Sequence, residues 1–304
     1  MRYLLIAFLL IPISIFPQIK NTQEAHILIE QYKSNYSNKN LNLLRNVYKK
    51  HLKSANFSIG KVKRNIPFGE HPLQKLDIHY DQSYKEKSPV IIFIHGGAFV
   101  RGDKSDYEIF DNVLNYFARN GFTGINANYR LAPEYKWPSG AEDIASIIQW
   151  IKTHHEAHNL DSNNIFLMGH SAGAAHVATY SFNEEIQVNS GDDGLNGAIL
   201  LSGVYKNSSE ESKKNYYGYS QNNMPIENID GRKIPMFIID AEYDKLNTQL
   251  ESIILIKELC RIHDKCPHHK QIPLHNHYSM MYHFNTLDNS IAEDILVFMR
   301  NNIK

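Results

Sequence analysis

Residues 163–180, NNIFLMGHSAGAAHVATY, restrict what this chain can fold into more than any other stretch. Residues 165–168 suit a buried strand, and the small residues 174–178 suit a closely packed helix. Between them GHSAG fits the G-x-S-x-G pattern, in which a serine occupies a sharp strand-to-helix turn and the glycines allow the two elements to approach. The stretch therefore predicts Ser171 as a nucleophile, although five residues alone also fit a chance glycine-serine turn.

Strand-like and helix-like segments alternate along most of the remaining chain. Apolar runs predict strands at residues 75–80, 89–97, 122–130, 197–203 and 234–240, and helical periodicity predicts helices at residues 141–155 and 290–303. Such alternation is typical of an α/β fold with a mostly parallel central sheet and helices on both faces. A chain of 304 residues fits one such domain with additions.

The additions lie at the amino terminus and inside the domain. Arg2 followed by the apolar residues 4–16 predicts a signal peptide over residues 1–20, hence export, with cleavage left open between residues 16 and 23. An uncleaved anchor is the alternative. Residues 21–70 form a helical segment that either caps the site or packs beside it, and residues 71–304 form the catalytic domain.

Residues 204–231 interrupt the alternation of strands and helices. The segment is polar and contains Tyr205, Tyr216, Tyr217 and Tyr219. Long connections inside compact domains are commonly functional or disordered. We expect a lid-like insertion that contacts substrate, with a solvated surface loop as the alternative.

Charge and cysteine content exclude several classes of function. Lys and Arg total 32, as do Asp and Glu, so no net charge favours binding to nucleic acid or an anionic membrane. No stretch of the mature chain is apolar enough to span a bilayer. In an oxidising compartment Cys260 and Cys266 can close a disulfide, and two free thiols are the alternative.

A glycine-rich loop ends the apolar run at residues 89–97. His95 is followed by Gly96, Gly97 and Ala98, and glycines allow the backbone N–H groups to approach a substrate closely. A serine that attacks a carbonyl creates an oxyanion, which such N–H groups and the one after the nucleophile, on Ala172, can bind. These residues predict an oxyanion hole.

Four motifs in one order identify a resemblance to a known family. They are the loop at residues 95–98, NYRLAPE at residues 128–134, WP at residues 137–138 followed by Asp143, and GHSAG at residues 169–173. From about Leu76 onward the chain resembles α/β-hydrolase carboxylesterases of the hormone-sensitive-lipase-like and feruloyl-esterase-like (BD-FAE-like) group. The resemblance implies that Tyr129, Arg130, Glu134 and Asp143 brace the loops behind the oxyanion hole.

The same resemblance implies the other two members of a catalytic triad. Serine, acid and histidine follow in that order in this fold. Asp244 matches the position of the acid, while Asp240 and Glu242 remain open as alternatives. His277 matches the position of the base, with His275 as the second candidate.

A metal site is not expected from the histidine pattern. His275 and His277 form H-x-H, and His268 and His269 lie nearby, but no matching carboxylate or cysteine pattern accompanies them. We therefore expect neither a metal nor an organic cofactor.

The expected activity is hydrolysis of small or short-acyl esters through an acyl-enzyme on Ser171. Hydrolysis of an amide or formamide uses the same groups and is the alternative. A non-catalytic binding domain is a minor alternative, because a fold does not establish an activity.

Overall fold

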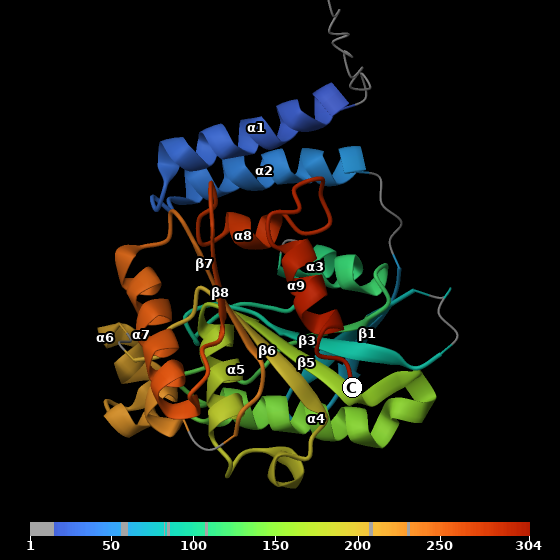
Figure 1. The fold of residues 1–304 in the computed structure, drawn as a ribbon, viewed down its shortest axis with the longest axis vertical. Coiled ribbons are helices and arrows are strands. Elements are labelled where there is room, and N and C mark those ends of the chain that lie inside the picture. Colours follow the sequence, from blue (N-terminus) through green and yellow to red (C-terminus); the bar gives the residue numbers. More distant parts are fainter. Residues whose placement is uncertain are drawn as a thin grey trace, which may run out of the picture.

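The computed structural model describes residues 15–55, 60–81, 83, 86–106, 109–206, 209–229 and 232–304. The strands are β1 (Lys61–Pro67), β2 (Lys75–Tyr80), β3 (Ser88–Ile94), β4 (Thr123–Ala127), β5 (Leu160–His170), β6 (Leu195–Leu201), β7 (Met236–Ala241) and β8 (His268–Ile272). The principal helices are α1 (Ile15–Tyr32), α2 (Asn38–Ala55), α3 (Ile109–Ala118), α4 (Ser139–His158), α5 (Ala172–Phe182), α7 (Leu246–His263), α8 (Ser279–Tyr282) and α9 (Ala292–Arg300). Figure 1 shows their arrangement.

The strands form one sheet in the order β1-β2-β4-β3-β5-β6-β7-β8. From β4 to β8 every neighbouring pair is parallel, and only the pairs that involve β2 are antiparallel. The carboxyl ends of β3, β5, β6, β7 and β8 therefore meet at one edge of the sheet. The predicted α/β fold with a mostly parallel sheet is confirmed.

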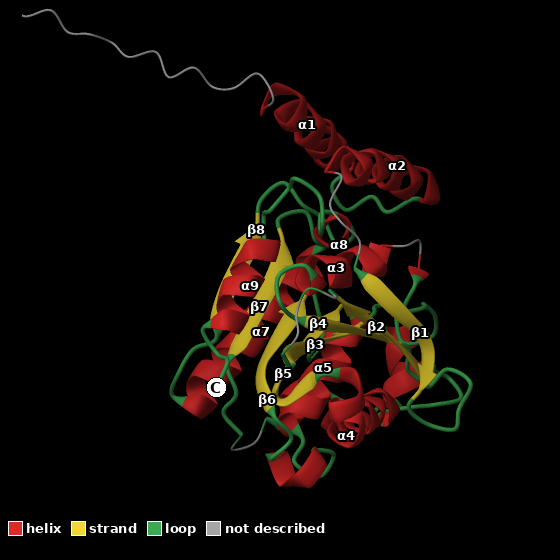
Figure 2. Cartoon of the chain, turned by 90° about the vertical axis from the view of Figure 1, so that its right-hand side faces the viewer, coloured by secondary structure: helices red, strands yellow, loops and turns green. Residues whose placement is uncertain are grey.

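Each face of the sheet buries one hydrophobic core. Along β3, Val90 and Ile92 pack into the core shared with α4 and α5, whereas Ile91 and Phe93 pack into the core shared with α3 and α9. Helices thus cover both faces, as Figure 2 shows. This double burial explains the continuous apolar run of β3, because both sides of the strand exclude water.

The edge strand β1 is absent from the elements that the sequence predicts. Only Val62 and Ile66 are half-buried, and the other residues, which include Lys61, Lys63 and Arg64, are exposed. Charged residues are common on edge strands, where they weaken the apolar signal. The strand is recognisable only through its pairing with β2.

Helices α1 and α2 form an antiparallel pair that lies over α8 (Figures 1 and 2). Arg45 of α2 donates to the Tyr282 hydroxyl at 3.2 Å, and Asn276 donates to the carbonyl of Lys33 at 3.1 Å. Most of the predicted signal peptide lies outside the described residues, and α1 begins at Ile15, within the predicted range. Among the described residues every helix is too short or too polar to cross a bilayer.

The predicted insertion consists of short helices, including α6 (Glu210–Ser212) and a π-helical turn η3 (Lys213–Tyr217). Tyr205, Tyr216 and Tyr217 are buried and belong to the core on the α4 and α5 face, whereas Tyr219 is 61% exposed. The three buried tyrosines anchor the segment to this core, so the segment is not a solvated surface loop. A lid role remains a prediction.

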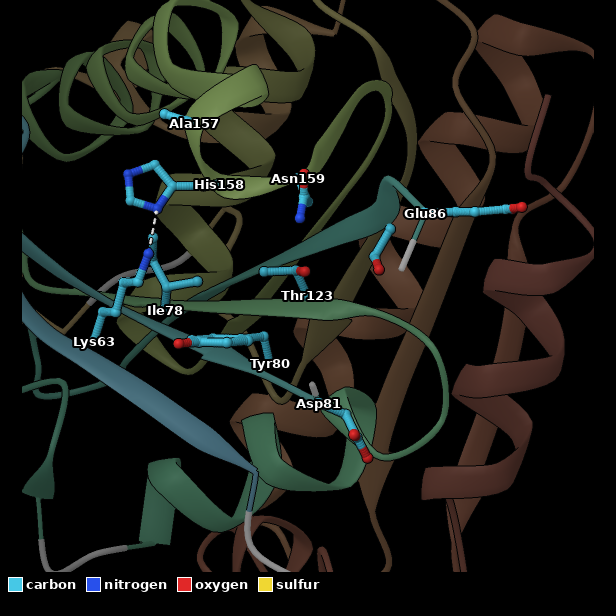
Figure 3. A pocket seen from close by; sticks show the side chains of 10 residues that line it. Lys63, Ile78, Tyr80, Asp81, Glu86, Thr123, Ala157, His158 and Asn159 are labelled. Carbon is cyan, nitrogen blue, oxygen red and sulfur yellow. Dashed lines mark hydrogen bonds between the residues drawn. The ribbon is translucent and has the colours of Figure 1, made fainter. Parts of the chain in front are cut away.

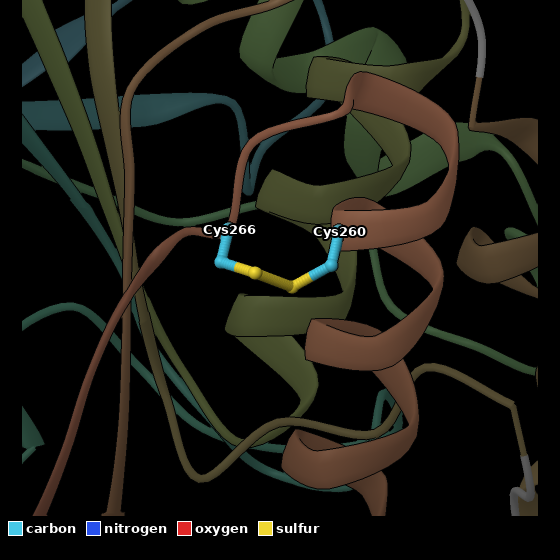
Figure 4. The surroundings of a disulfide bond; sticks show 2 residues. All are labelled: Cys260 and Cys266. Carbon is cyan, nitrogen blue, oxygen red and sulfur yellow. A yellow bond between two sulfur atoms is a disulfide. The ribbon is translucent and has the colours of Figure 1, made fainter.

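The two cysteines lie at the end of α7. Cys260 on the helix and Cys266 just before β8 are joined by a disulfide, which Figure 4 shows. The bond closes the turn between α7 and β8.

Candidate active site

Ser171 occupies the bend between β5 and α5. Its φ of 56° and ψ of −118° lie outside the regions that most residues adopt, and such conformations persist where the surroundings enforce them. A Cβ atom at Gly169 would lie 2.4 Å from the carbonyl oxygen of Gly173, and one at Gly173 would lie 2.1 Å from that of Ile94. The glycines of the motif are therefore required by the close approach of strand and helix.

Asp244 and His277 come together at the same edge of the sheet, after β7 and β8. His277 Nδ1 lies 3.0 Å from Asp244 Oδ1. Asp244 Oδ2 accepts hydrogen bonds from the Ser202 hydroxyl at 2.6 Å and from the Ala241 N–H at 2.9 Å. Burial alone would raise the pKa of Asp244, but these hydrogen bonds and the His277 contact lower it below its ordinary value.

The alternative acids and base have other partners. Asp240 accepts hydrogen bonds from His269 at 2.7 Å and Gln271 at 2.8 Å, and Glu242 accepts one from the Leu274 N–H at 2.7 Å. Buried His275 contacts Ser279 and Ser290 instead of Asp244. The structure thus pairs Asp244 with His277 and leaves the other candidates outside this contact.

His170 connects the serine turn to the loop that carries His277. Its Nε2 lies 2.8 Å from the His277 carbonyl oxygen, so Nε2 carries the proton and donates. Its ring centroid lies 4.7 Å from that of His277. Burial, followed by the charge of His277, lowers the pKa of His170 to about 3, so this imidazole stays neutral near pH 7.

The glycine-rich loop lies against the serine turn. A Cβ atom at Gly96 would lie 3.0 Å from Ser171 Cβ, and one at Gly97 would lie 1.8 Å from the carbonyl oxygen of Arg101. Gly97, Ala98 and Phe99 all have positive φ angles, of 139°, 53° and 70°. The backbone of the loop therefore has an unusual conformation and runs close to Ser171.

The N–H groups at the start of α5 complete this environment. Ala172 is the first residue of the helix, and the first N–H groups of a helix have no intrahelical acceptor. The positive end of the helix dipole adds to their attraction for a negative charge. The start of α5 beside Ser171 is therefore a favourable environment for a negative charge.

Of the four residues that the motif resemblance implied as braces, Tyr129 contacts the loop directly. The Tyr129 hydroxyl donates to the His95 carbonyl at 3.1 Å. The Tyr129 ring stacks on the His95 imidazole, with ring centroids 4.5 Å apart. Arg130 donates to Asp143 through its backbone N–H at 2.7 Å and its Nε at 2.8 Å. Glu134 is exposed.

Two further residues of the site were not found from the sequence. Ser202, at the carboxyl end of β6, donates to Asp244, and its place directly after an apolar strand is the only sequence signal. Tyr36, between α1 and α2, lies with its ring 6.1 Å from that of His277 and donates from its hydroxyl to the Tyr243 carbonyl at 3.1 Å. No local pattern connects Tyr36 to a loop more than two hundred residues away.

A separate cavity lies at the opposite edge of the sheet. It has a volume of about 370 Å³, and Figure 3 shows Lys63 and His158 pointing toward one another inside it, with Nζ and Nδ1 3.3 Å apart. Ser88 and Thr123, at the amino ends of β3 and β4, also line it. Open α/β sheets bind ligands at the carboxyl ends of their strands, so this cavity is not part of the site.

Part of the chain is similar to known proteins. A family model, BD-FAE, matches residues 76–216. Esterase LipC of Mycobacterium tuberculosis is 32% identical over 112 residues, which are 36% of this chain and 27% of that protein. The gibberellin receptor GID1 of rice (Oryza sativa subsp. japonica) is 30% identical over 136 residues, which are 43% of this chain and 36% of the receptor. The chain thus spans only about a quarter to a third of the length of these relatives.

Solved structures extend the similarity to nearly the whole chain. An esterase from Pyrobaculum calidifontis superposes with a TM-score of 0.69 at 18% identity and covers 95% of this chain and 99% of its own. At that identity the comparison shows the fold, which is the α/β-hydrolase fold. The motifs, the family model and this fold together confirm the predicted resemblance to α/β-hydrolase carboxylesterases.

Proposed function

We infer that this α/β-hydrolase, which resembles carboxylesterases, is a serine hydrolase that cleaves carboxylic esters. The observation that carries the proposal is the contact of His277 with Asp244 at the sheet edge where Ser171 occupies its strained turn. A serine becomes an effective nucleophile when a base takes its proton and a third group orients that base. The names of the relatives support the ester as the substrate class.

In the proposed reaction His277 takes the proton of the Ser171 hydroxyl as its oxygen attacks the ester carbonyl. Backbone N–H groups of Gly96, Gly97, Ala98 and Ala172 are the candidates to bind the oxyanion. The protonated His277 then gives its proton to the departing alcohol. Water, deprotonated by the same histidine, attacks the acyl-enzyme and releases the acid. Asp244 holds the imidazole tautomer in which Nδ1 donates and Nε2 faces the reaction.

We also propose that the protein is exported through its amino-terminal segment. The disulfide between Cys260 and Cys266 supports this, because such bonds persist in oxidising compartments. Fractionation of cells that express the full chain, with amino-terminal sequencing of the product, tests it. We expect a shortened chain outside the cytoplasm, and an intact chain inside it would contradict export.

The experiment that tests the activity compares wild type with Ser171→Ala on p-nitrophenyl acetate, butyrate and decanoate and on an aryl formamide. We expect ester hydrolysis by the wild type and a loss of kcat/KM of about 10⁴-fold or more in the variant. The series of acyl chains would measure the preferred chain length. Cleavage of the formamide alone would replace the esterase proposal with the amidase alternative.

A binding domain is the second candidate, favoured by the similarity to a protein named as a receptor. Labelling with a fluorophosphonate separates the two. An esterase forms an adduct on Ser171 that the Ser171→Ala variant cannot form. A wild type that neither labels nor hydrolyses any of these substrates would favour the binding domain.

A further inference from the structure

Three side chains from distant parts of the sequence meet beside the loop that carries His277. They are His26 of α1, His275 after β8 and Asp288 before α9. His26 Nε2 lies 3.6 Å from Asp288 Oδ2, and His275 Nε2 lies 3.2 Å from the same oxygen. All three atoms lie within 4.8 Å of one another. Two imidazole nitrogens and one carboxylate oxygen thus converge on one point.

These separations suit ligands of a metal better than partners of a hydrogen bond. A tetrahedral ion with bonds of about 2.0–2.1 Å holds its ligand atoms roughly 3.3–3.4 Å apart. The 3.6 Å between His26 and Asp288 is too long for a hydrogen bond. The 3.2 Å between His275 and Asp288 exceeds the usual length of a charge-assisted one.

Neighbouring hydroxyl groups orient two of the three ligands. Asp288 Oδ1 accepts hydrogen bonds from the Ser290 N–H at 3.1 Å and from the Ser290 hydroxyl, whereas Oδ2 makes no hydrogen bond in the described part of the chain. His275 Nδ1 lies 3.1 Å from the Ser279 hydroxyl, which leaves Nε2 directed toward Asp288. Outer hydrogen bonds of this kind fix the tautomer and orientation of metal ligands.

The charge of the cluster also favours a bound cation. Asp288 is buried, and the described residues that form ion pairs with it are histidines, without a lysine or arginine. A buried carboxylate is costly unless a positive charge accompanies it. Buried His283 adds a third imidazole, whose ring lies 5.3 Å from that of His275.

A proton is the competing source of that charge. His275 Nε2 lies 3.2 Å from the Ser290 hydroxyl as well as from Asp288, so a proton on Nε2 would serve both. It would leave His26 Nε2, a buried atom, without any hydrogen bond in the described residues. A metal ion satisfies both imidazoles and the carboxylate at once.

We propose that His26, His275 and Asp288 bind a divalent transition metal ion of the Zn²⁺ type. Two imidazoles and one carboxylate form a ligand set that zinc accepts, with a water in the fourth position. The ion would join α1 to the loop that carries His277, because His26 and His275 come from those two elements. Its role in this proposal is structural, since neither Ser171 nor His277 is a ligand.

The test uses tag-free wild type, Asp288→Asn and His26→Gln, with His268→Gln as the matched control because His268 is an exposed histidine outside the cluster. Each protein is stripped with a chelator, incubated with ZnCl₂, desalted and analysed by mass spectrometry for bound zinc. We expect about one zinc per chain in wild type and His268→Gln and a loss in the other two variants. We also expect Zn²⁺ to raise the melting temperature only where it binds.

Two results would overturn the proposal. One is wild type that retains no zinc and melts at the same temperature with and without it. The other is equal zinc binding in wild type and in both cluster variants, which would place the metal elsewhere. Circular dichroism of each stripped variant establishes that it is folded. Neither readout uses ester hydrolysis, so the result is independent of the proposed activity.

Discussion

At the scale of single residues, Asp244 is the position where a small change has the clearest expected effect. Its Oδ1 contacts His277, while its Oδ2 accepts two hydrogen bonds that keep the carboxylate in place. An amide at this position can donate to His277 and select the wrong tautomer, and it cannot stabilise the imidazolium. We expect Asp244→Asn to lower kcat/KM for an ester about 10³- to 10⁴-fold.

Asp240→Asn is the matched control for that prediction. Asp240 lies near the end of β7, four residues before Asp244, and is also buried, but it contacts His269 and Gln271. We expect its kcat/KM to remain within about tenfold of wild type, because its partners take no part in the proposed reaction. Equal losses in the two variants would contradict the assignment of Asp244 as the acid.

At the scale of elements, the insertion and the glycine-rich loop are packed against each other. Phe99, which has a φ of 70°, stacks on Tyr216 with ring centroids 4.4 Å apart and planes 3° apart. The Tyr216 hydroxyl shares a hydrogen bond with His176 of α5 at 3.1 Å. A bulky residue with positive φ needs such support. The insertion thus supports the backbone that the proposed oxyanion hole uses.

Removing the Tyr216 ring is expected to loosen this loop. We predict that Tyr216→Leu lowers kcat by about tenfold to a hundredfold with a smaller effect on KM, because misplaced N–H groups lose transition-state stabilisation. Tyr216→Phe keeps the stacked ring and should stay within a few-fold of wild type. Measurements well below the melting temperature of each variant separate this effect from unfolding.

Tyr219→Leu serves as the control from the same insertion, because Tyr219 is exposed. It should leave kcat unchanged. If Tyr216→Leu matched wild type in kcat, the insertion would not support the oxyanion loop.

At the scale of the whole molecule, buried neutral histidines make the fold sensitive to acid. Burial, followed by a neighbouring histidine in each case, lowers the pKa of His170 and of His176 to about 3. Between that value and the ordinary value of about 6.5, the unfolded chain binds more protons than the folded one. The free energy of unfolding therefore falls as the pH drops below about 6.5.

At pH 5 each of these two histidines should cost about 2 kcal/mol of stability relative to pH 7. Urea unfolding at pH 7.5, 6 and 5 measures the loss. His176→Gln should reduce the loss, whereas replacement of the exposed His268 by Gln should leave it unchanged. Equal acid sensitivity in wild type and His176→Gln would show that His176 does not titrate as expected.

The sequence predicts the central sheet well because its strands are buried on both faces. Strands β3, β6 and β7 lie where their apolar runs predict them, and β2 matches residues 75–80. Strand β1 is exposed and charged, so its residues carry no such run, and only pairing with β2 forms it. Burial of the tyrosines in the insertion depends on contacts with Phe99 and α5. The polar sequence of the segment does not predict these contacts.

Some residues of the candidate site can likewise be predicted from the sequence, and others cannot. Ser171 and the glycine-rich loop follow from local geometry, since each needs glycines at fixed spacing. The choice of Asp244 over Asp240 rests in the sequence on family resemblance, and the structure adds the contact with His277. The cluster of His26, His275 and Asp288 has no local pattern, because the fold alone brings three distant segments together.

The polarity of the two edge strands affects whether two molecules can associate through their sheets. Strand β1 exposes Lys61, Lys63 and Arg64, and at the far edge β8 begins with the exposed His268 and His269. Polar and charged edges discourage a second sheet from adding its strands. Concentrated solutions of the folded protein should therefore resist aggregation through sheet extension.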